Sequence, residues 1–228
     1  MAEPIHFSGT IDDAELAAAL RVLPMFPLPG VVLFPHALMP LHIFEERYRA
    51  MTRDVLAGRR CLAVSLIAPG ETSTTEKPAV QRVCGVGEIV MAHELPDGRY
   101  NLVLRGRARV RIDEELASDR PYRVVSATVL PDLPSPEAAD LADAAASLRA
   151  LVGRLADAIP EGGELLRQVI AALGTPAELV DVVAAALIED PRLRQRLLET
   201  RETGKRIERV SAEVVAMTGR IASPGAVN

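Results

Sequence analysis

Residues 23–49 hold five of the chain's seventeen prolines and three of its four phenylalanines, in the order LPMFPLPGVVLFPHALMPLHIFEERYR. Proline fixes φ and has no backbone N–H to donate, so a helix cannot run through the proline-containing part of this stretch. The apolar residues between the prolines must therefore be buried by strand pairing and sheet packing. Pro29-Gly30 predicts a tight turn, because glycine accepts the positive φ that can follow proline. The stretch is thus predicted to form two or three short strands joined by turns.

An amphipathic helix is predicted directly after these strands. From Ile43 the polarity of the sequence changes, and Phe44, Tyr48, Met51 and Val55 then follow at helical spacing. A helix of this kind must bury its apolar face. We therefore expect it to pack back onto the preceding strands.

The chain continues with strand-like sequence as far as Leu130. Apolar and β-branched residues recur in four segments, 61–67, 80–92, 100–112 and 122–130. Pro96-Asp97-Gly98 is a strong turn signal and predicts a hairpin. The segments together predict a mostly antiparallel sheet, curled or closed, with one helix against it. Residues 1–21 are expected to form a peripheral tail with a short helix.

Four arginines alternate with small and apolar residues in the third of these segments. The spacing of Arg105, Arg107, Arg109 and Arg111 places all four on one face of a strand. Such a face could be a docking strip for phosphate or for acidic segments of another protein. It could instead be a solvated face that carboxylates such as Glu88 or Glu94 neutralise across the sheet. The sequence leaves both interpretations open.

Proline-rich sequence at residues 131–136, PDLPSP, predicts a stiff connector and a domain boundary. Capping and proline signals, with apolar residues at helical spacing, predict helices over 135–159, 165–173, from 176 onward, and over 191–221. The predicted domains are therefore a β subdomain at 22–131 and a helical bundle subdomain at 135–222.

The last of these helices is predicted to be long, roughly 45 Å at the α-helical rise per residue. A small bundle cannot cover an apolar stripe of that length. We expect the part beyond Ile207 to project from the bundle, so that the bundle itself does not bury Val210, Val214 and Met217. Either the helix folds back on the sheet or it pairs with a second copy. We favour the second outcome, a homodimer through this C-terminal helix.

Composition and charge restrict the class of protein. The net charge of −5 argues against a dedicated binder of nucleic acid or of anionic membranes, because these need a positive field. The sequence shows neither a membrane-spanning apolar run nor the basic-then-apolar order of a signal peptide. We therefore expect a cytoplasmic protein. Cys61 and Cys84 lie in apolar, strand-like sequence and are expected to be buried, reduced thiols.

The motifs of common enzyme sites are missing from the sequence. It has no GxxxxGK[ST] phosphate loop, no GxSxG elbow and no HExxH zinc helix. Gly85-Val86-Gly87 lacks the third glycine of a dinucleotide loop and predicts a β-bulge or a close strand crossing instead. His36 and His42 have no carboxylate or thiol at ligand spacing. We therefore expect no catalytic residues, no metal site and no cofactor.

The proline-rich stretch also resembles a known family, the N-terminal, substrate-binding domain of Lon protease. The resemblance rests on the following residues: Leu23, Pro24, Phe26, Pro27, Leu28, Val31, Val32, Leu33, Phe34, Pro35, Leu38, Pro40, Leu41, Ile43, Phe44, Glu45, Arg47 and Tyr48. It implies an α+β fold, with a PUA-like, mostly antiparallel β-barrel and one packed helix at 22–131. A C-terminal helical bundle ending in a long helix follows. The ATPase and Ser-Lys peptidase domains of full-length Lon have no counterpart in this sequence, so we expect a free-standing, non-catalytic form.

The resemblance also implies a function, the recognition of exposed or misfolded polypeptide. We expect the chain to bind such clients in a groove between barrel and bundle, as an adaptor to a protease or chaperone. The candidate substrate-binding residues are Phe34, His36, Leu38, Phe44, Tyr48, Arg105, Arg107 and Arg109. The aromatic residues among them could instead be core residues. The alternative function is that of a PUA-like RNA-binding module that uses the arginine face, although the acidic net charge makes nucleic acid the less expected partner.

Overall fold

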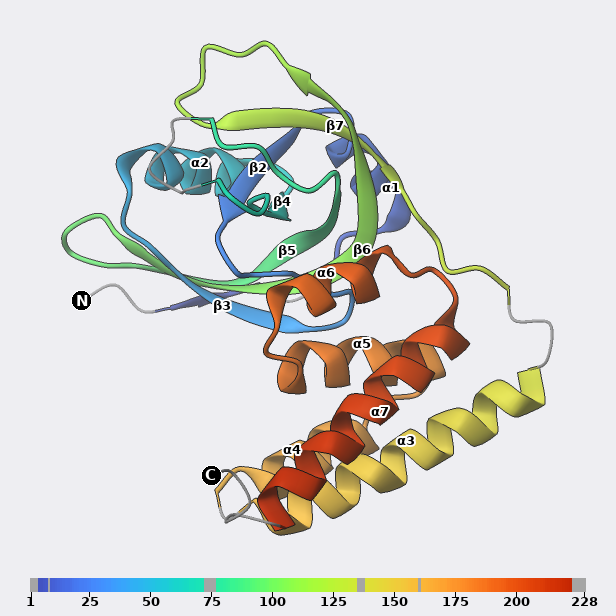
Figure 1. Cartoon of the computed structure of the whole chain (residues 1–228). Helices are drawn as coiled ribbons and strands as arrows, with labels where there is room; N and C mark the ends of the chain where they lie inside the picture. Colours follow the sequence, from blue (N-terminus) through green and yellow to red (C-terminus); the bar gives the residue numbers. More distant parts are fainter. Residues whose placement is uncertain (1–3, 8, 72–76, 135–137, 160, 223–228) are drawn as a thin grey trace. The chain divides into compact units, whose positions relative to one another are not determined.

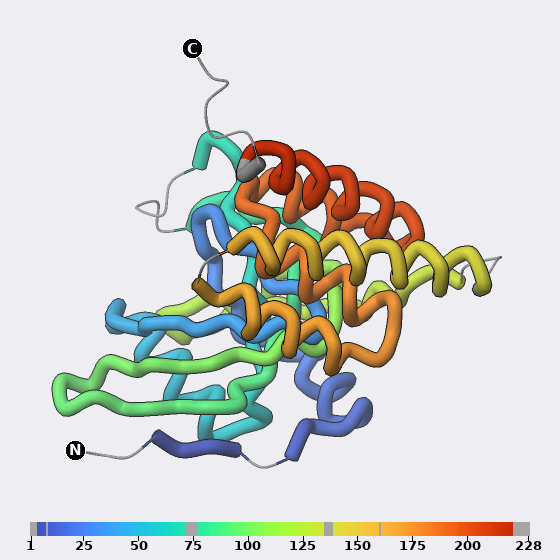
Figure 2. The backbone as a smooth tube through the Cα atoms, turned by 90° about the horizontal axis from the view of Figure 1, so that it is seen from below, coloured from blue at the N-terminus to red at the C-terminus, as the bar shows by residue number. Residues whose placement is uncertain are grey.

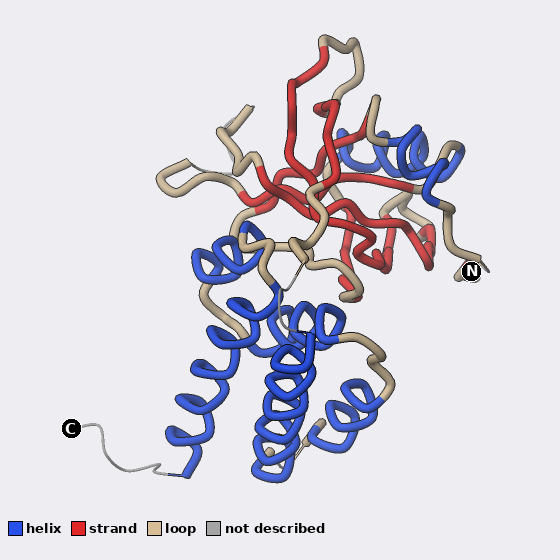
Figure 3. Tube along the Cα trace, turned by 90° about the vertical axis from the view of Figure 1, so that its right-hand side faces the viewer, coloured by secondary structure: helices blue, strands red, loops and turns tan. Residues whose placement is uncertain are grey.

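A computed structural model of the chain describes residues 4–7, 9–71, 77–134, 138–159 and 161–222. The chain divides into two compact units, Met1–Pro131 and Asp132–Asn228 (Figure 1). Among the described residues, every strand lies in the first unit and the second consists of helices and their connections (Figure 3). The fold is therefore α+β, as the sequence predicted.

The first unit is built around a closed, mostly antiparallel barrel. Its described elements are β1 (Ile5–His6), α1 (Asp13–Ala19), β2 (Leu23–Leu28), β3 (Leu38–Ile43), α2 (Glu46–Ala57), β4 (Cys61–Leu66), β5 (Val83–Glu94), β6 (Tyr100–Leu116) and β7 (Arg123–Val129). The strand order is β1-β5-β4-β2-β7-β6-β3, and a further pairing of β5 with β6 closes the ring. Strands β2 and β4 are parallel, whereas the other described pairs are antiparallel. The predicted mostly antiparallel barrel is confirmed.

Two glycines let an extended segment cross the sheet between β2 and β3. A Cβ atom at Gly85 would lie 2.1 Å from the carbonyl oxygen of Leu33, and one at Gly106 would lie 1.9 Å from that of Phe34. A larger residue at either position could not coexist with this crossing. The close crossing predicted at Gly85 is therefore present. The segment that makes it is buried although it belongs to no strand, and so the proline-rich stretch contains two strands rather than three.

The core of the barrel has two parts, and the second shows that residues 1–21 are more than a tail. One cluster gathers the apolar face of α2 with residues of β2, β4, β5 and β6. The other gathers Ile11, Leu16 and Leu20, on or beside α1, with the opposite face of β2 and β4. The backbone N–H of Ile11 also donates to the buried carboxylate of Glu88 on β5, at 3.2 Å. The structure differs here from the peripheral tail we expected, because α1 supplies apolar side chains that cover one face of the sheet.

The second unit is a helical bundle. Its elements are α3 (Ala138–Ala158), α4 (Gly163–Ala171), α5 (Pro176–Leu187), α6 (Pro191–Glu199) and α7 (Thr203–Ala222). Helix α3 runs beside α7 and also packs on α4 and α5 (Figure 2). Thr175 and Glu178 form the complete capping box that the sequence predicted before α5.

The long helix predicted over 191–221 is interrupted, and α6 and α7 are separate helices. Thr200 has an extended ψ of 109°. Its carbonyl accepts a hydrogen bond from the Arg206 guanidinium at 2.9 Å, and that of Arg201 accepts one from the N–H of Leu133 at 3.1 Å. Asp132 pairs with the same guanidinium at 2.9 Å. The break is stable because these partners replace the hydrogen bonds that a continuous helix would have made.

The apolar residues of α7 are covered within the bundle and do not project into solvent. Val210 and Val214 are both 0% exposed, and Met217 is partly covered. The prediction of an open seam was wrong because α3, with 21 residues, is long enough to run along α7. The reason for expecting a homodimer through this face is thereby removed.

The described residues contain neither a membrane-spanning helix nor a group of His, Cys, Asp or Glu side chains that could hold a metal ion. Cys61 and Cys84 are free and buried, as predicted. Burial raises the pKa of both thiols to about 12.

Candidate functional site

A small apolar pocket opens beside Phe44, where β2 and β3 end and α2 begins. Its volume is about 270 Å³, and we call it the apolar pocket. It is lined by Phe26, Pro27, Leu28, Pro29, Leu41, His42, Phe44, Glu45, Arg47, Tyr48, Ile67 and Pro78. Phe44 is 61% exposed, and its ring stacks on that of His42 with centroids 6.2 Å apart. An exposed aromatic ring beside an apolar hollow is a typical anchor for a bound side chain.

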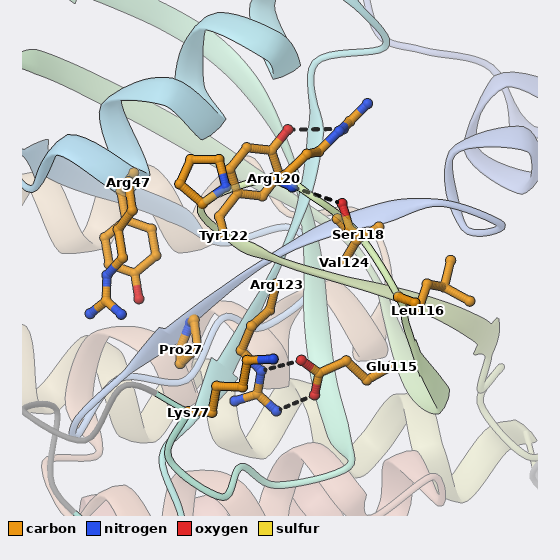
Figure 4. A pocket seen from close by; sticks show the side chains of 13 residues that line it. Pro27, Arg47, Lys77, Glu115, Leu116, Ser118, Arg120, Tyr122, Arg123 and Val124 are labelled. Carbon is orange, nitrogen blue, oxygen red and sulfur yellow. Dashed lines mark hydrogen bonds and ion pairs between the residues drawn. The ribbon is translucent and has the colours of Figure 1, made fainter.

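A larger pocket adjoins the first and shares Pro27, Arg47 and Tyr48 with it. Its volume is about 640 Å³. The remaining lining residues are Lys77, Glu115, Leu116, Ala117, Ser118, Arg120, Pro121, Tyr122, Arg123 and Val124. Four of the side chains are cationic and one, Glu115, is anionic, so we call it the basic pocket. Figure 4 shows Arg47, Arg120 and Lys77 on three different sides of it.

Tyr48 forms the floor that the two pockets share. Its ring lies 4.4 Å from that of Phe26 on β2, and the guanidinium of Arg47 lies over it, 4.6 Å from the ring centroid. Tyr48 is buried, and this burial raises its pKa. The first turn of α2 is thereby fixed on the barrel, with Arg47 held at the border between the pockets.

Hydrogen bonds to Tyr122 hold the far wall of the basic pocket. Its hydroxyl donates to Asp54 on α2 at 2.5 Å and accepts from Nη1 of Arg120 at 2.8 Å. Burial, followed by the hydrogen bond and the charge of Asp54, raises the pKa of Tyr122 to about 12. The connection between β6 and β7 is thus tied to α2, and Arg120 is held at the rim of the pocket (Figure 4).

The four cations differ in how far their charge is already balanced. Arg123 makes a two-point contact with Glu115, at 3.0 and 2.7 Å, and also donates to the carbonyl of Pro78. Arg47 pairs with Glu45 at 2.9 Å. Within the described part of the chain, Lys77 and Arg120 have no carboxylate at ion-pair distance. The basic pocket therefore carries an excess of positive charge.

Two of the eight residues predicted to bind substrate line these pockets. Phe44 is at the mouth of the apolar pocket, and Tyr48 is in the shared floor. Phe34 is fully buried against Gly106, which places it in the core interpretation that the sequence also allowed. His36 and Leu38 are exposed but line neither pocket.

Only part of the predicted arginine face is exposed to solvent. Arg107 pairs with the buried carboxylate of Glu88 at 3.6 Å and donates to the carbonyl of Ile11. Arg109 is 4% exposed. Arg111 pairs with Asp113 at 3.1 Å, and Arg105 is exposed beside Leu38 in the register of β3 and β6. Neutralisation by Glu88 was one of the two interpretations of this face, and it applies to Arg107.

Sequence reasoning did not identify Lys77, Arg120, Tyr122 or Arg123. Lys77 and Arg120 lie in loops far apart along the chain, and nothing in either loop indicates that they face one pocket. The strand-like segment 122–130 predicted a strand but not the contact of Tyr122 with α2. The wall of the basic pocket depends on the contact between Asp54 and Tyr122, which are 68 residues apart. No local sequence pattern indicates a contact over that separation.

Comparisons with known proteins agree with this architecture. The family model of the ATP-dependent protease La (LON) substrate-binding domain matches residues 22–215. The Lon protease of Xanthomonas oryzae pv. oryzae is 27% identical over 193 residues, which cover 82% of this chain and 22% of that protease. This chain therefore spans under a quarter of the length of that relative.

Two solved structures share the fold. The N-terminal domain of Mycobacterium avium complex Lon protease superposes with a TM-score of 0.69 at 15% identity, and covers 86% of this chain and 98% of that one. The Lon N-terminal domain protein from Xanthomonas campestris gives 0.59 at 25% identity, with 84% and 97% coverage. Because the family model matches residues 22–215, which is most of this chain, the chain belongs to the family of Lon substrate-binding domains.

Proposed function

We propose that this chain recognises polypeptide clients through the apolar and basic pockets of its barrel. The observation that carries the proposal is Phe44, an exposed ring at the mouth of an apolar pocket, in a domain of a substrate-binding family. A client segment in extended conformation would bury an apolar side chain against Phe44, Leu41 and Ile67. Such burial is favourable for any unfolded apolar segment, so it supports broad recognition of exposed or misfolded polypeptide.

The proposed role is recognition without catalysis. Residues 22–215, which the family model matches, would hold the client, while a protease or chaperone partner would unfold or cleave it. Of the residues expected from sequence, His36, Leu38 and Arg105 remain candidates for a separate contact at the other end of β3.

The proposal is tested by the affinity of the full chain for a fluorescein-labelled peptide with a Phe- and Leu-rich core. We expect Phe44→Ser to weaken binding about fivefold to thirtyfold, because truncation of an aromatic anchor typically costs about 1–2 kcal/mol. Val22→Ser is the matched control, since Val22 is also exposed, at 56%, but lines neither pocket. Equal affinity of Phe44→Ser and the wild type would refute this surface. A loss in Leu38→Ser instead would move the site to the other end of β3.

A further inference from the structure

We infer that the basic pocket receives an acidic side chain of the client, so that the preferred clients carry Asp or Glu a few residues from an apolar anchor. The inference rests on the proposed function and adds the chemical class of segment that the site selects. It concerns the basic pocket, whereas the general binding of apolar polypeptide depends on the apolar pocket.

The charge of the basic pocket is the first argument. Arg47, Lys77, Arg120 and Arg123 line it, with Glu115 as the one carboxylate among its lining residues. The chain as a whole has a net charge of −5, so this excess of cations is a local feature. A concave surface lined by charges of one sign attracts ligands of the opposite sign.

The second argument is the availability of hydrogen-bond donors. Arg120 uses Nη1 to donate to the Tyr122 hydroxyl at 2.8 Å, which orients the guanidinium, and the other nitrogens of the guanidinium have no acceptor in the described part of the chain. Lys77 is exposed and likewise has no acceptor among the described residues. A guanidinium that is already oriented loses little conformational freedom when a carboxylate binds. Arg120 and Lys77 are thus the two groups available to an acidic side chain.

The continuity of the two pockets is the third argument. They share Pro27, Arg47 and Tyr48, so one extended segment can reach both. An extended chain advances about 3.3 Å per residue, and its side chains alternate in direction. An apolar residue beside Phe44 and an acidic residue near Arg120 or Lys77 can therefore belong to the same short segment.

A polypeptide carboxylate fits this pocket better than nucleic acid does. Proteins that bind single-stranded nucleic acid stack its bases on exposed aromatic rings along a positive groove. The two aromatic residues of the basic pocket, Tyr48 and Tyr122, are both buried and are engaged by Phe26 and Asp54. The pocket thus offers charge without a stacking platform.

The test uses three fluorescein-labelled peptides that share one Phe- and Leu-rich core and differ in their flanks, which are Asp and Glu, Asn and Gln, or Lys. We expect the full chain to bind the acidic peptide about threefold to tenfold more tightly than the amide peptide, as two exposed ion pairs allow. The preference should shrink as salt is raised. Lys77→Gln/Arg120→Gln should abolish the preference, so that this variant binds the acidic and the amide peptide with equal affinity.

Matched variants separate the pocket from the overall charge. Arg111→Gln/Lys205→Gln also removes one arginine and one lysine charge, but from residues that do not line the pocket, and it should keep the preference. Glu115→Gln removes the one carboxylate that lines the pocket and should increase it. Lys77→Arg/Arg120→Lys should retain it. Thermal unfolding of each variant confirms that it is folded, and Lys77→Gln alone should lose part of the preference if the double variant is unstable.

The possible failures are distinguishable. Equal binding of the acidic and amide peptides by the wild type would overturn this inference and leave the proposed function intact. Absence of binding by all three peptides would overturn both. Tight binding of a single-stranded RNA that Lys77→Gln/Arg120→Gln abolishes would reassign the pocket to nucleic acid and overturn the inference as well.

Discussion

Single residues decide the shape of the candidate site, and Tyr122 is the most informative of them. Its hydroxyl lies between Asp54 and Arg120, so one side chain both fixes the wall of the basic pocket and presents a cation to it. Phe44 and Tyr48 could be named from the sequence because they lie within the stretch that resembles the Lon substrate-binding domain. Tyr122 could not, because its role depends on a partner 68 residues away.

The pH dependence of stability tests this contact. Burial and Asp54 raise the pKa of Tyr122 from 10.0 to about 12, so the folded protein keeps this proton where the unfolded chain loses it. The resulting stabilisation is complete below pH 10 and is lost as the pH rises through the folded-state pKa. We expect Tyr122→Phe to show a smaller loss of stability than the wild type between pH 10 and 12, measured by urea unfolding.

The comparison with the wild type is needed because other groups titrate in the same pH range. Burial raises the pKa of Cys61 and Cys84 to about 12 as well, so both proteins should lose stability in alkali. At pH 7, Tyr122→Phe should be less stable by about 1 kcal/mol, the usual net contribution of one hydrogen bond. Identical pH profiles for the two proteins would show that burial and Asp54 do not raise the pKa of Tyr122 in the folded protein.

Among the elements, α6 and α7 show where sequence periodicity misleads. The three- and four-residue spacing of the apolar stripe continues from Leu197 through Thr200 and Gly204 to Ile207, so the sequence predicts one helix. The break depends on Arg206, whose guanidinium holds the Thr200 carbonyl and pairs with Asp132, 74 residues away. Its Nε also lies 3.1 Å from Asp181. A local pattern cannot show that partners of this kind exist.

Adjacent valines on α7 give a matched test of the bundle. Val214 is 0% exposed and Val215 is 54% exposed. We expect Val214→Asp to lower the free energy of unfolding by about 3 kcal/mol or more, because it buries a carboxylate without a partner. Val215→Asp should change it by no more than about 0.5 kcal/mol. Chemical unfolding followed by circular dichroism measures both.

Light scattering on the same two variants addresses the homodimer. A stable, monomeric Val214→Asp variant of a dimeric wild type would mean that this face is an interface between copies rather than the core of one bundle. The burial of Val210 and Val214 under α3 predicts the opposite, a loss of stability in Val214→Asp without a specific change of mass.

At the scale of the whole molecule, the sequence was sufficient for the fold class and insufficient for the site. Prolines, turn signals and β-branched segments predicted a mostly antiparallel sheet followed by helices, and the family resemblance implied that the sheet forms a barrel. The contribution of residues 1–21 was missed because Ile11, Leu16 and Leu20 form only a short apolar pattern. The pockets were missed because they arise where α2 meets the end of β2 and the start of β7, which are contacts between distant segments.

Two truncated chains test the division into domains, which remains a prediction. We expect residues 1–131 to fold alone with a β-rich circular dichroism spectrum, because the barrel closes within them. Residues 22–131 should be less stable by several kcal/mol, since burial of each large aliphatic side chain contributes about 1.5–3 kcal/mol and three are removed. An unfolded 1–131 fragment would show that the barrel requires the bundle. Equal stability of the two fragments would show that residues 1–21 are indeed peripheral.

The most direct test of the central claim, that clients bind at the apolar and basic pockets, is amide hydrogen exchange of the full chain with and without the acidic Phe- and Leu-rich peptide. We predict slower exchange on binding at residues 26–30, 41–48 and 115–124, which contain most of the lining of the two pockets. We expect no change in α3 and α7. Protection confined to the helical unit, or to the Leu38 end of β3, would contradict binding at these pockets.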